Sequence, residues 1–182
     1  MMMKSPAYIS LRNLLYSLTF LMIMISCRGG RERQPEDKPS DYKESLINAN
    51  KEVVRTESEQ IDDFIARHGW QMTETATGLR YMVYKKGIGP TGQKGKVVKL
   101  NYSMTLLTGD TVYSSSSDGP MQFVAGQGQV ISGLEEAILL LNVGDRAKII
   151  IPSHLAFGLI GDQNKIRHKA SLVYDVEFVT MY

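Results

Sequence analysis

The residues that most often carry metal or acid–base chemistry are few and scattered in this chain. The three histidines are His68, His154 and His168, and the one cysteine is Cys27. No two histidines have the spacing that places a metal pair on one face of a helix, and no cysteine lies near them in the sequence. The sequence therefore predicts no metal, no cofactor and no nucleophile–histidine pair, and it favours surface or turn positions for the histidines.

Two further patterns resemble reactive sites but lack essential residues. The stretch GPTGQKGK at 89–96 resembles a phosphate-binding loop, but Pro90 stands at its first glycine position. Val97 also follows Lys96 where serine or threonine is needed to complete that loop. The serine run 114–117 has no histidine close to it in the sequence, so we interpret it as a loop rather than a set of nucleophiles.

The apolar residues alternate with a period of two after Gly78, which indicates strands. In VGDRAKIIIPSHLAFG, at 143–158, an apolar strand is stopped by a proline and followed by an aromatic, Phe157. In 98–106 polar residues alternate with apolar ones, so one face of that strand is expected to be solvated. Strands are predicted at 79–84, 98–106, 111–113, 146–151 and 172–179, with one short helix at 134–141. This order predicts an α+β fold in which a curved antiparallel half-barrel sheet wraps the helix.

An amphipathic helix is predicted upstream of this domain. Asp41 and Glu44 suit its start, and His68-Gly69 suits its end. Its polar segment TESEQ, at 56–60, predicts a break or fraying in the middle. The apolar stripe must pack on the following domain, which is the commoner outcome, or on a second copy, which would form a homodimer. The stripe consists of Leu46, Ile47, Val53, Val54, Ile61, Phe64 and Ile65.

The first 26 residues are typical of a signal peptide. Lys4 and Arg12 precede an uncharged run of twelve residues, 14–25, whereas a bilayer core needs roughly 20. The run ends in Ser26-Cys27, which resembles the lipobox of bacterial lipoproteins, so lipidation of Cys27 is predicted. The alternative is a signal peptide that happens to contain a free thiol. The predicted domains are 1–26 signal peptide, 27–40 lipidated tether, 41–77 N-terminal helical extension and 78–182 folded domain.

The charge of the mature chain bears on its partners and location. Removal of residues 1–26 leaves 19 basic and 19 acidic residues, because that segment contains Lys4 and Arg12 and no acid. A formally neutral chain lacks the net basic charge that phosphate backbones attract, so no nucleic acid partner is expected. No acidic run follows Cys27, and we therefore expect the bacterial cell envelope, with a lipid anchor to the membrane and the domain facing the periplasm.

The stretch 94–182 resembles the FKBP-type peptidyl-prolyl cis-trans isomerase domain. The matching pieces, in the family's order, are VKLNYSM, GDTVYSS, PMQFVAGQGQVISGLEEAI, VGDRAKIIIPSHLAFG and ASLVYDVEF. The upstream helix, followed by HGW and TGLRYMVYKKGIG, resembles the extension of envelope lipoproteins in this family, most of all the gliding-motility-associated isomerases. The resemblance implies the half-barrel fold, isomerisation of X-Pro bonds, and proline-containing segments of exported proteins as partners.

The resemblance also implies which residues form the proline site. Taken alone, each of them is typical of core packing, so the functional interpretation rests on the set. For Phe123, which also matches, we expect a plain core position. Carried over as catalytic are Tyr102, Tyr113, Ile131 through its backbone N–H, Phe157 and Tyr174, and as substrate-binding Met121, Val130, Leu134 and Ile166.

Four positions depart from the family's pattern. Phe157 stands for a tyrosine, Leu134 for a tryptophan, Ser114 for an aspartate and Met121 for an aromatic residue. We therefore expect reduced activity and weak binding of macrolide inhibitors. The alternative is a weakly catalytic or non-catalytic chaperone or binding module that uses the same pocket and the N-terminal helix. The basic loop 161–170 is interpreted as solvated or, alternatively, as steering acidic client segments to the pocket.

Overall fold

The structure is a computed structural model that describes residues 39–182, with side chains from residue 43 onward. The signal segment 1–26, Cys27 and most of the predicted tether lie outside the described residues. Residues 46–182 form one compact unit, which contains the sheet and most of the first described helix. Among the described helices, none has the length and apolar character that crossing a membrane requires.

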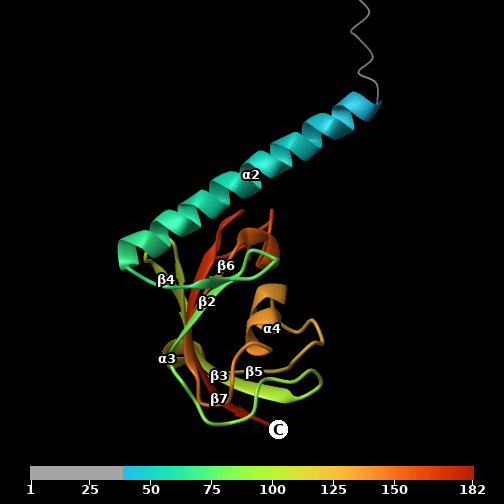
Figure 1. Ribbon diagram of the computed structural model, residues 1–182. Helices are drawn as coiled ribbons and strands as arrows, with labels where there is room; N and C mark the ends of the chain where they lie inside the picture. The colour runs from blue at the N-terminus through green and yellow to red at the C-terminus, as the bar shows by residue number, and fades with distance from the viewer. Residues whose placement is uncertain (1–38) are drawn as a thin grey trace, which may run out of the picture. The chain divides into compact units, whose positions relative to one another are not determined.

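Seven strands and a few helices make up the described part of the chain (Figure 1). The helices are α2 (Pro39–His68), α3 (Ser115–Asp118) and α4 (Ser132–Ile138), with a 3₁₀ turn η1 (Ser153–Leu155). The strands are β1 (Thr73–Glu74), β2 (Arg80–Lys85), β3 (Val97–Leu106), β4 (Thr111–Ser114), β5 (Met121–Val124), β6 (Arg146–Ile151) and β7 (Leu172–Met181). The predicted strands are confirmed to within a few residues. The predicted short helix begins two residues earlier and ends three residues earlier than the expected 134–141.

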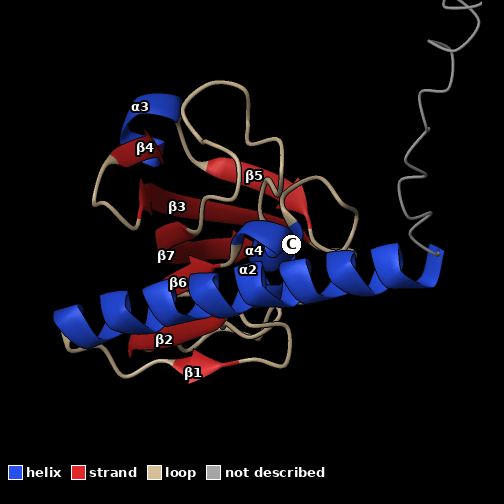
Figure 2. Ribbon diagram, turned by 90° about the horizontal axis from the view of Figure 1, so that it is seen from above, coloured by secondary structure: helices blue, strands red, loops and turns tan. Residues whose placement is uncertain are grey.

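All strand pairs are antiparallel, and the sheet has the order β1-β2-β6-β7-β3-β4, with β5 also pairing with β3 (Figure 2). Because successive side chains point to opposite faces of a strand, the register decides which residues share a face. Two neighbouring rows across β6, β7 and β3 are Ile149, Tyr174 and Met104 on one face, and Ile150, Val173 and Thr105 on the other. We call these the inner face and the outer face. An open antiparallel sheet with one short helix on its inner face and a longer helix before it confirms the predicted fold class.

Helix α4 lies against the inner face (Figure 1) and closes the main core. Leu134, Ala137 and Ile138 of α4 are buried in one cluster with inner-face residues such as Ile149 and Tyr174. Gly133 permits this close approach, because a Cβ at that position would lie 2.3 Å from the Ile151 side chain. The inner face is therefore both the centre of the core and the support on which α4 sits.

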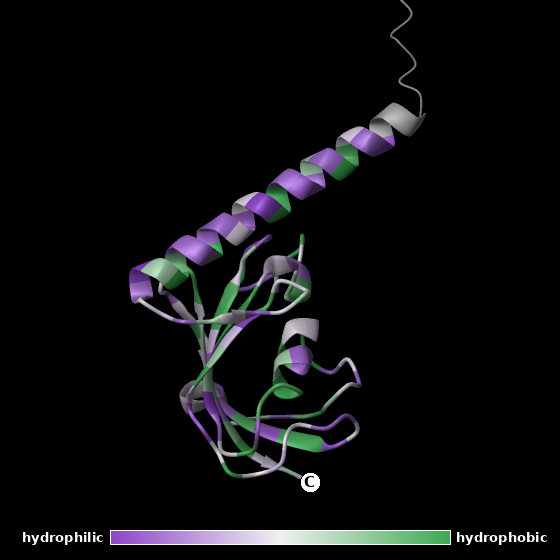
Figure 3. Cartoon of the chain, in the orientation of Figure 1, coloured by the Kyte–Doolittle hydropathy of each residue, from purple (hydrophilic) through white to green (hydrophobic). Residues whose placement is uncertain are grey.

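Helix α2 packs on the outer face through the C-terminal half of its apolar stripe. Ile61 and Phe64 are buried against Ile150 and Val173 in a second apolar cluster, separate from the main core. The predicted packing of the stripe on the following domain is thus confirmed for this half of the helix. Farther toward the N-terminus, apolar positions still recur along α2 (Figure 3), but Val53 and Val54 are 38% and 51% exposed.

The predicted break in α2 at TESEQ is wrong, because the helix is continuous from Pro39 to His68. The polar segment is held by hydrogen bonds to distant parts of the domain. The Glu57 carboxylate accepts bonds from the Ser153 N–H at 2.6 Å, the Ser153 hydroxyl at 2.9 Å and the Ser171 hydroxyl at 2.5 Å. The Ser58 hydroxyl accepts a 2.8 Å bond from Arg80, whose side chain is only 5% exposed. The polar residues therefore dock the helix rather than interrupt it.

Candidate functional site

All nine residues assigned to the proline site belong to one apolar cluster on the inner face. Three of them, Leu134, Ile166 and Tyr174, are 0%, 3% and 2% exposed and form its floor. The other six are partly exposed and pack against that floor: Tyr102, Tyr113, Met121, Val130, Ile131 and Phe157. Phe123, expected as plain core, is 3% exposed. The cluster thus combines a buried base with a partly solvent-accessible rim, and all nine side chains are uncharged.

Two tyrosines on neighbouring strands connect the floor to the rim. Tyr174 of β7 is buried, and Tyr102 of β3 is partly exposed, with 6.2 Å between the two ring centroids. Burial raises the pKa of the Tyr174 phenol, and the neighbouring Tyr102 adds to that shift. Burial also raises the pKa of Tyr102, with a smaller contribution from the charge of Asp118. Both phenols therefore stay neutral and can act only as apolar walls or as hydrogen-bond partners.

Ile131 sits immediately before α4 with extended backbone angles, φ −58° and ψ 143°. Its carbonyl accepts hydrogen bonds from the N–H groups of Leu134 and Glu135, at 3.0 Å and 3.2 Å, as the first residue before a helix should. Its own N–H donates no hydrogen bond within residues 39–182. The side chain of Ile131 belongs to the rim, so a backbone donor with no partner in the described part of the chain lies at the edge of an apolar cluster.

Phe157 follows β6 and the 3₁₀ turn η1, where the chain bends back over the inner face. Two backbone hydrogen bonds hold this bend, from Gly158 N–H to the Ser153 carbonyl at 2.8 Å and from Gly161 N–H to the Phe157 carbonyl at 3.2 Å. The ring packs on the main core and is partly exposed. The next two residues, Leu159 and Ile160, are 75% and 72% exposed, so the rim continues into an apolar loop tip.

The loop 161–170 carries Ile166 into the floor and is braced by Asp162. One carboxylate oxygen of Asp162 accepts bonds from the N–H groups of Asn164 and Ile166, at 2.9 Å and 2.7 Å. The other accepts a 2.5 Å bond from the Tyr113 hydroxyl of β4. Gly161 is required at the loop's start, because its φ is +73° and a Cβ there would lie 2.2 Å from the Ile166 carbonyl oxygen. Asp162 therefore fastens the loop both to itself and to the neighbouring strand.

This brace changes the acidity of both partners. Burial by itself would raise the pKa of Asp162, but the bonds from the Tyr113 hydroxyl and from the Ile166 and Asn164 N–H groups outweigh it, so the net shift is downward. The bond to Asp162 is also the main cause of a raised pKa at Tyr113. Asp162 stays charged and Tyr113 stays neutral over the physiological range, which keeps the bond intact there.

Sequence reasoning did not single out Asp162 as a residue of this site. The sequence places Asp162 in the same loop as Ile166, which is the only indication it offers of a role in the site. Tyr113 lies 49 positions before Asp162, and no local pattern in the sequence connects these two residues. Not all of the basic residues predicted to be solvated in this loop are free in the structure. Lys165 donates a 2.9 Å bond to the Val112 carbonyl and lies 4.8 Å from the centre of the Tyr113 ring. Arg167 and Lys169 are exposed, so these two remain as the loop's solvated cations.

Comparison with known proteins places this geometry in a family. The family model for FKBP-type peptidyl-prolyl cis-trans isomerases matches residues 89–179. FK506-binding protein 2 of Dictyostelium discoideum is 40% identical over 88 residues, which are 48% of this chain and 66% of that protein. The probable FKBP-type isomerase FkpA of Neisseria meningitidis serogroup B is 40% identical over 107 residues, 58% of this chain.

These matches cover only part of this chain and only part of each relative. The chain spans only 38% of the length of the Neisseria protein and 66% of the Dictyostelium protein. Among solved structures, the crystal structure of AtFKBP13 matches with a TM-score of 0.60 and 28% identity, over 62% of this chain and 100% of that one. The matched region contains all nine residues assigned to the proline site, Tyr102 to Tyr174. The chain belongs to the FKBP-type peptidyl-prolyl cis-trans isomerase family.

Proposed function

We propose that the inner-face cluster catalyses cis–trans isomerisation of X-Pro peptide bonds in exported proteins, in a protein that is tethered to the membrane by a lipid on Cys27. The observation that carries the catalytic part is the uncharged cluster itself, with its buried floor and partly exposed aromatic rim. Family membership supports the reaction class. The tether and the exported clients are supported by the sequence at 1–27 alone.

The reaction suits a site without acids, bases or metal ligands. Rotation about a peptide bond has a barrier of about 18–20 kcal/mol because the amide must lose its resonance, and no covalent bond forms or breaks. At X-Pro bonds the uncatalysed step takes tens to hundreds of seconds. The planar amide is the more charge-separated form and is the better solvated by water. An apolar surface that replaces water around the bond therefore disfavours the planar form relative to the twisted one.

The Ile131 N–H supplies the directional part of this mechanism. A donor that is already fixed at the start of α4 can bind the carbonyl of the residue before proline without reorganisation. Phe157 closes one side, and the buried Tyr174 and Leu134 support the proline ring from below. Interactions that are stronger with the twisted amide than with the planar one lower the barrier, while equal binding of both would not.

Phe157→Tyr tests whether the cluster is catalytic. A hydroxyl at this partly exposed position adds a donor toward a bound carbonyl, and one neutral hydrogen bond is worth about 1 kcal/mol, or roughly fivefold in rate. We expect the variant to raise kcat/KM by about this factor in a protease-independent assay on X-Pro peptides. Phe123→Tyr, in the buried core, is the matched control and should not raise the rate. A wild-type rate that equals background at high enzyme concentration would refute the catalytic proposal.

A weakly catalytic chaperone or binding module is the second candidate. The exposed Leu159 and Ile160 beside Phe157 favour it, because an apolar loop tip next to the rim can hold unfolded chains without turning over a proline bond. Leu159→Ser together with Ile160→Ser separates the two functions. The chaperone candidate predicts loss of aggregation suppression with proline-free clients, whereas the isomerase predicts unchanged kcat on tetrapeptides.

The membrane tether rests on Cys27, which lies outside the described residues. Mass spectrometry of the N-terminal peptide from membrane fractions should find Cys27 as the first residue, carrying acyl chains. In Cys27→Ala the protein should move from the membrane fraction to the soluble fraction. An unmodified Cys27 thiol in the wild type would remove the lipid from the proposal, together with the envelope-anchored, periplasm-facing location that we infer from it.

A homodimer through α2 is a further part of the proposal. Leu46 and Ile47 are 48% and 44% exposed and continue the stripe of Val53 and Val54, so an apolar strip runs along the helix before it reaches the sheet. Burial of such a strip against a second copy would stabilise a dimer. Sedimentation of Leu46→Glu with Val53→Glu should give a monomer where the wild type gives a dimer. A monomeric wild type at high concentration would refute this part.

A further inference from the structure

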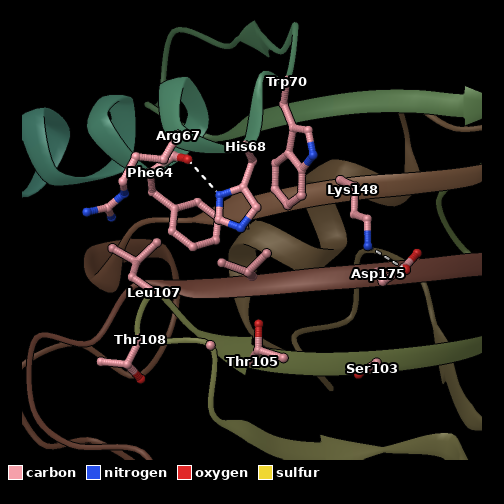
Figure 4. Close-up of a pocket in the computed structure, with 12 residues that line it drawn as sticks. Phe64, Arg67, His68, Trp70, Ser103, Thr105, Leu107, Thr108, Lys148 and Asp175 are labelled. Carbon is pink, nitrogen blue, oxygen red and sulfur yellow. Dashed lines mark hydrogen bonds and ion pairs between the residues drawn. The ribbon is translucent and has the colours of Figure 1, made fainter.

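The described part of the chain contains a cavity that the proline chemistry does not use. It lies on the outer face of the sheet, below the last turn of α2, and has a volume of about 770 Å³. Phe64, His68 and Trp70 form its upper wall, and Ser103 and Thr105 form its base (Figure 4), with Val173 also in the lining. The volume is within the range of about 300–1,000 Å³ that is typical of sites for small organic ligands. We call it the outer-face cavity.

Three aromatic rings form a fixed wall on one side of the cavity. The His68 ring lies 4.1 Å from Phe64 and 4.7 Å from Trp70, measured between ring centroids, and Phe64 meets Trp70 edge-on at 5.6 Å. The Nδ1 of His68 donates a 2.8 Å bond to the Phe64 carbonyl, which can only accept. That bond fixes the orientation of the imidazole. The wall is therefore already in place to stack against an apolar or aromatic group.

Three polar side chains of the cavity lining have no protein partner within residues 43–182. Arg67, Ser103 and Thr105 line the cavity, and within that range none of the three makes a side-chain hydrogen bond or ion pair. Arg67 is exposed and stands at one end of the cavity, away from Ser103 (Figure 4). The one carboxylate in the lining, Asp175, already accepts bonds from Lys148 at 2.6 Å and from the Tyr84 hydroxyl at 2.7 Å. Its charge is matched by Lys148, so Arg67 gives the cavity an excess of one positive charge.

From this arrangement we propose that the outer-face cavity binds a short peptide segment in which an acidic side chain is flanked by aromatic residues. The carboxylate pairs with Arg67 at the exposed end of the cavity, the hydroxyls at the base donate to the backbone of the segment, and an aromatic neighbour packs on the wall of Trp70 and His68. Charge complementarity selects the carboxylate, because a guanidinium binds carboxylates through two parallel bonds. The cavity is too large for a single carboxylate and its carbon, so a peptide fills it better than a small free acid.

This site is independent of proline recognition. Its residues come from α2, the segment that follows it, the turn between β3 and β4, and the outer-face positions of β3, β6 and β7. The proline cluster occupies the inner face. Side chains at alternate positions of the same strands thus serve two surfaces. A client can engage the outer-face cavity whether or not it presents an X-Pro bond, and loss of either site leaves the other in place.

Trp70 makes the proposal directly measurable, because it is the only tryptophan in the chain. The probe is the proline-free peptide Ac-Phe-Asp-Phe-NH₂, with Ac-Phe-Asn-Phe-NH₂ and Ac-Phe-Lys-Phe-NH₂ as matched peptides, titrated into the full-length protein. We expect a saturable change in Trp70 fluorescence with the Asp peptide. The Asn peptide should bind about five- to tenfold more weakly, since a hydrogen bond to a charged group is worth about twice a neutral one. Higher salt should weaken only the Asp peptide.

Substitutions on α2 supply the matched test. Arg67→Gln should weaken binding of the Asp peptide about tenfold and abolish its preference over the Asn peptide. Lys51→Gln makes the same charge change on an exposed position of the same helix, away from the cavity, and should leave binding unchanged. Thr105→Val should weaken binding about threefold, because it removes one hydroxyl at similar size.

Three results would overturn the proposal. Equal affinity for the Asp and Asn peptides, or unchanged affinity in Arg67→Gln, would show that no carboxylate is recognised. Isothermal titration calorimetry reports binding where the tryptophan signal does not change, and the absence of both heat and fluorescence change would show that the cavity takes no such peptide. Because the probes contain no proline, these failures leave the isomerase proposal untouched, and a failed X-Pro assay leaves this one untouched.

Discussion

The two faces of β6, β7 and β3 are made from alternate residues of the same strands, yet they hold their helices in different ways. On the inner face α4 is held mainly by burial, with Leu134 and Ile138 at 0% exposure in the main core, and its polar bonds, such as that of Glu136 with Thr77, lie at exposed positions. On the outer face α2 is held by a small apolar cluster and by polar bonds, above all those of Glu57. The inner face is uncharged, whereas the outer face carries ion pairs such as Lys148 with Asp175.

The difference shows why one face can be the core and also the catalytic surface that we propose. Rotation about a prolyl bond is faster in an apolar environment, and packing also produces such an environment. The same apolar residues can therefore serve both stability and catalysis on the inner face. Polar recognition on the outer face requires groups that are free of protein partners, such as Arg67, and these contribute little to the fold. Substitutions on the inner face should therefore change stability and activity together, and substitutions on the outer face should separate them.

The largest effect is expected for Leu134→Ala on the inner face. Leu134 is fully buried, and removal of a buried leucine side chain typically lowers the free energy of unfolding by about 2–5 kcal/mol. Isomerase activity should fall as well, because the same side chain supports the proline site. Denaturant unfolding followed by the peptide assay measures both. The matched control is Val53→Ala on the exposed part of α2, which should cost less than about 0.5 kcal/mol. A cost below that in Leu134→Ala would contradict the placement of this residue in the floor.

Glu57→Gln tests the outer face with the next largest effect. The neutral amide cannot accept all three bonds that Glu57 now accepts, so one donor loses its acceptor and the remaining bonds lose the strength that the charge gave them, at a cost of about 1–3 kcal/mol. Hydrogen exchange in the TESEQ turn should speed up while kcat on X-Pro peptides stays within about twofold. Glu59→Gln, which removes the same charge two residues later, where the carboxylate contacts only Arg55, should change neither. Equal effects of the two variants would show that Glu57 does not dock the helix.

Much of the fold could be predicted from local patterns in the sequence. The predictions that differ from the structure do so for one reason, which is contact between residues far apart in the sequence. Alternation of apolar residues predicted the strands because burial on one face of a sheet repeats every two residues. The break predicted in α2 is absent because the partners of Glu57 lie 96 and 114 positions away, where no helical pattern can reveal them. For the same reason the solvated outer face expected for 98–106 is partly covered by α2 beside Ser103 and Thr105.

In the candidate site, too, some residues could be assigned from the sequence, whereas others depend on contacts between distant parts of the chain. Its nine residues could be assigned because the family resemblance fixes their order along the chain, and the structure brings all nine into one cluster. Asp162 could not be assigned, because its role depends on a bond to Tyr113 across the gap between a strand and a loop. The outer-face cavity could not be foreseen either. Trp70 follows a helix end in the sequence, and only the packing of α2 brings it over β6.

The Tyr113–Asp162 brace tests whether loop 161–170 positions Ile166 for the inner face. Tyr113→Phe removes the bond to Asp162, and Asp162→Asn weakens that bond together with those from the Asn164 and Ile166 N–H groups. We expect a loss of roughly two- to fivefold in kcat/KM for each, mainly through KM. The double variant should lose no more than the larger single loss, because the two residues share one interaction. Ser116→Ala, a matched loss of a hydroxyl at an exposed position, should have no effect. Losses that simply add would show that the two residues act separately.

The smallest expected effect is the pH dependence of that brace. The pKa of Asp162 is lowered in the folded protein, so the stabilisation is fully present above the ordinary aspartate pKa of about 3.9 and is lost as the pH falls through the lower folded value. The difference in unfolding free energy between wild type and Asp162→Asn should therefore be constant from about pH 8 to 5 and should shrink below about pH 4. Comparison with this variant isolates Asp162 from Glu177, whose pKa is also lowered, chiefly by bonds from Asn101 and Arg146. If the difference in unfolding free energy grew as the pH fell, the folded protein would favour the protonated carboxyl group of Asp162. The Tyr113–Asp162 bond would then not depend on a charged carboxylate.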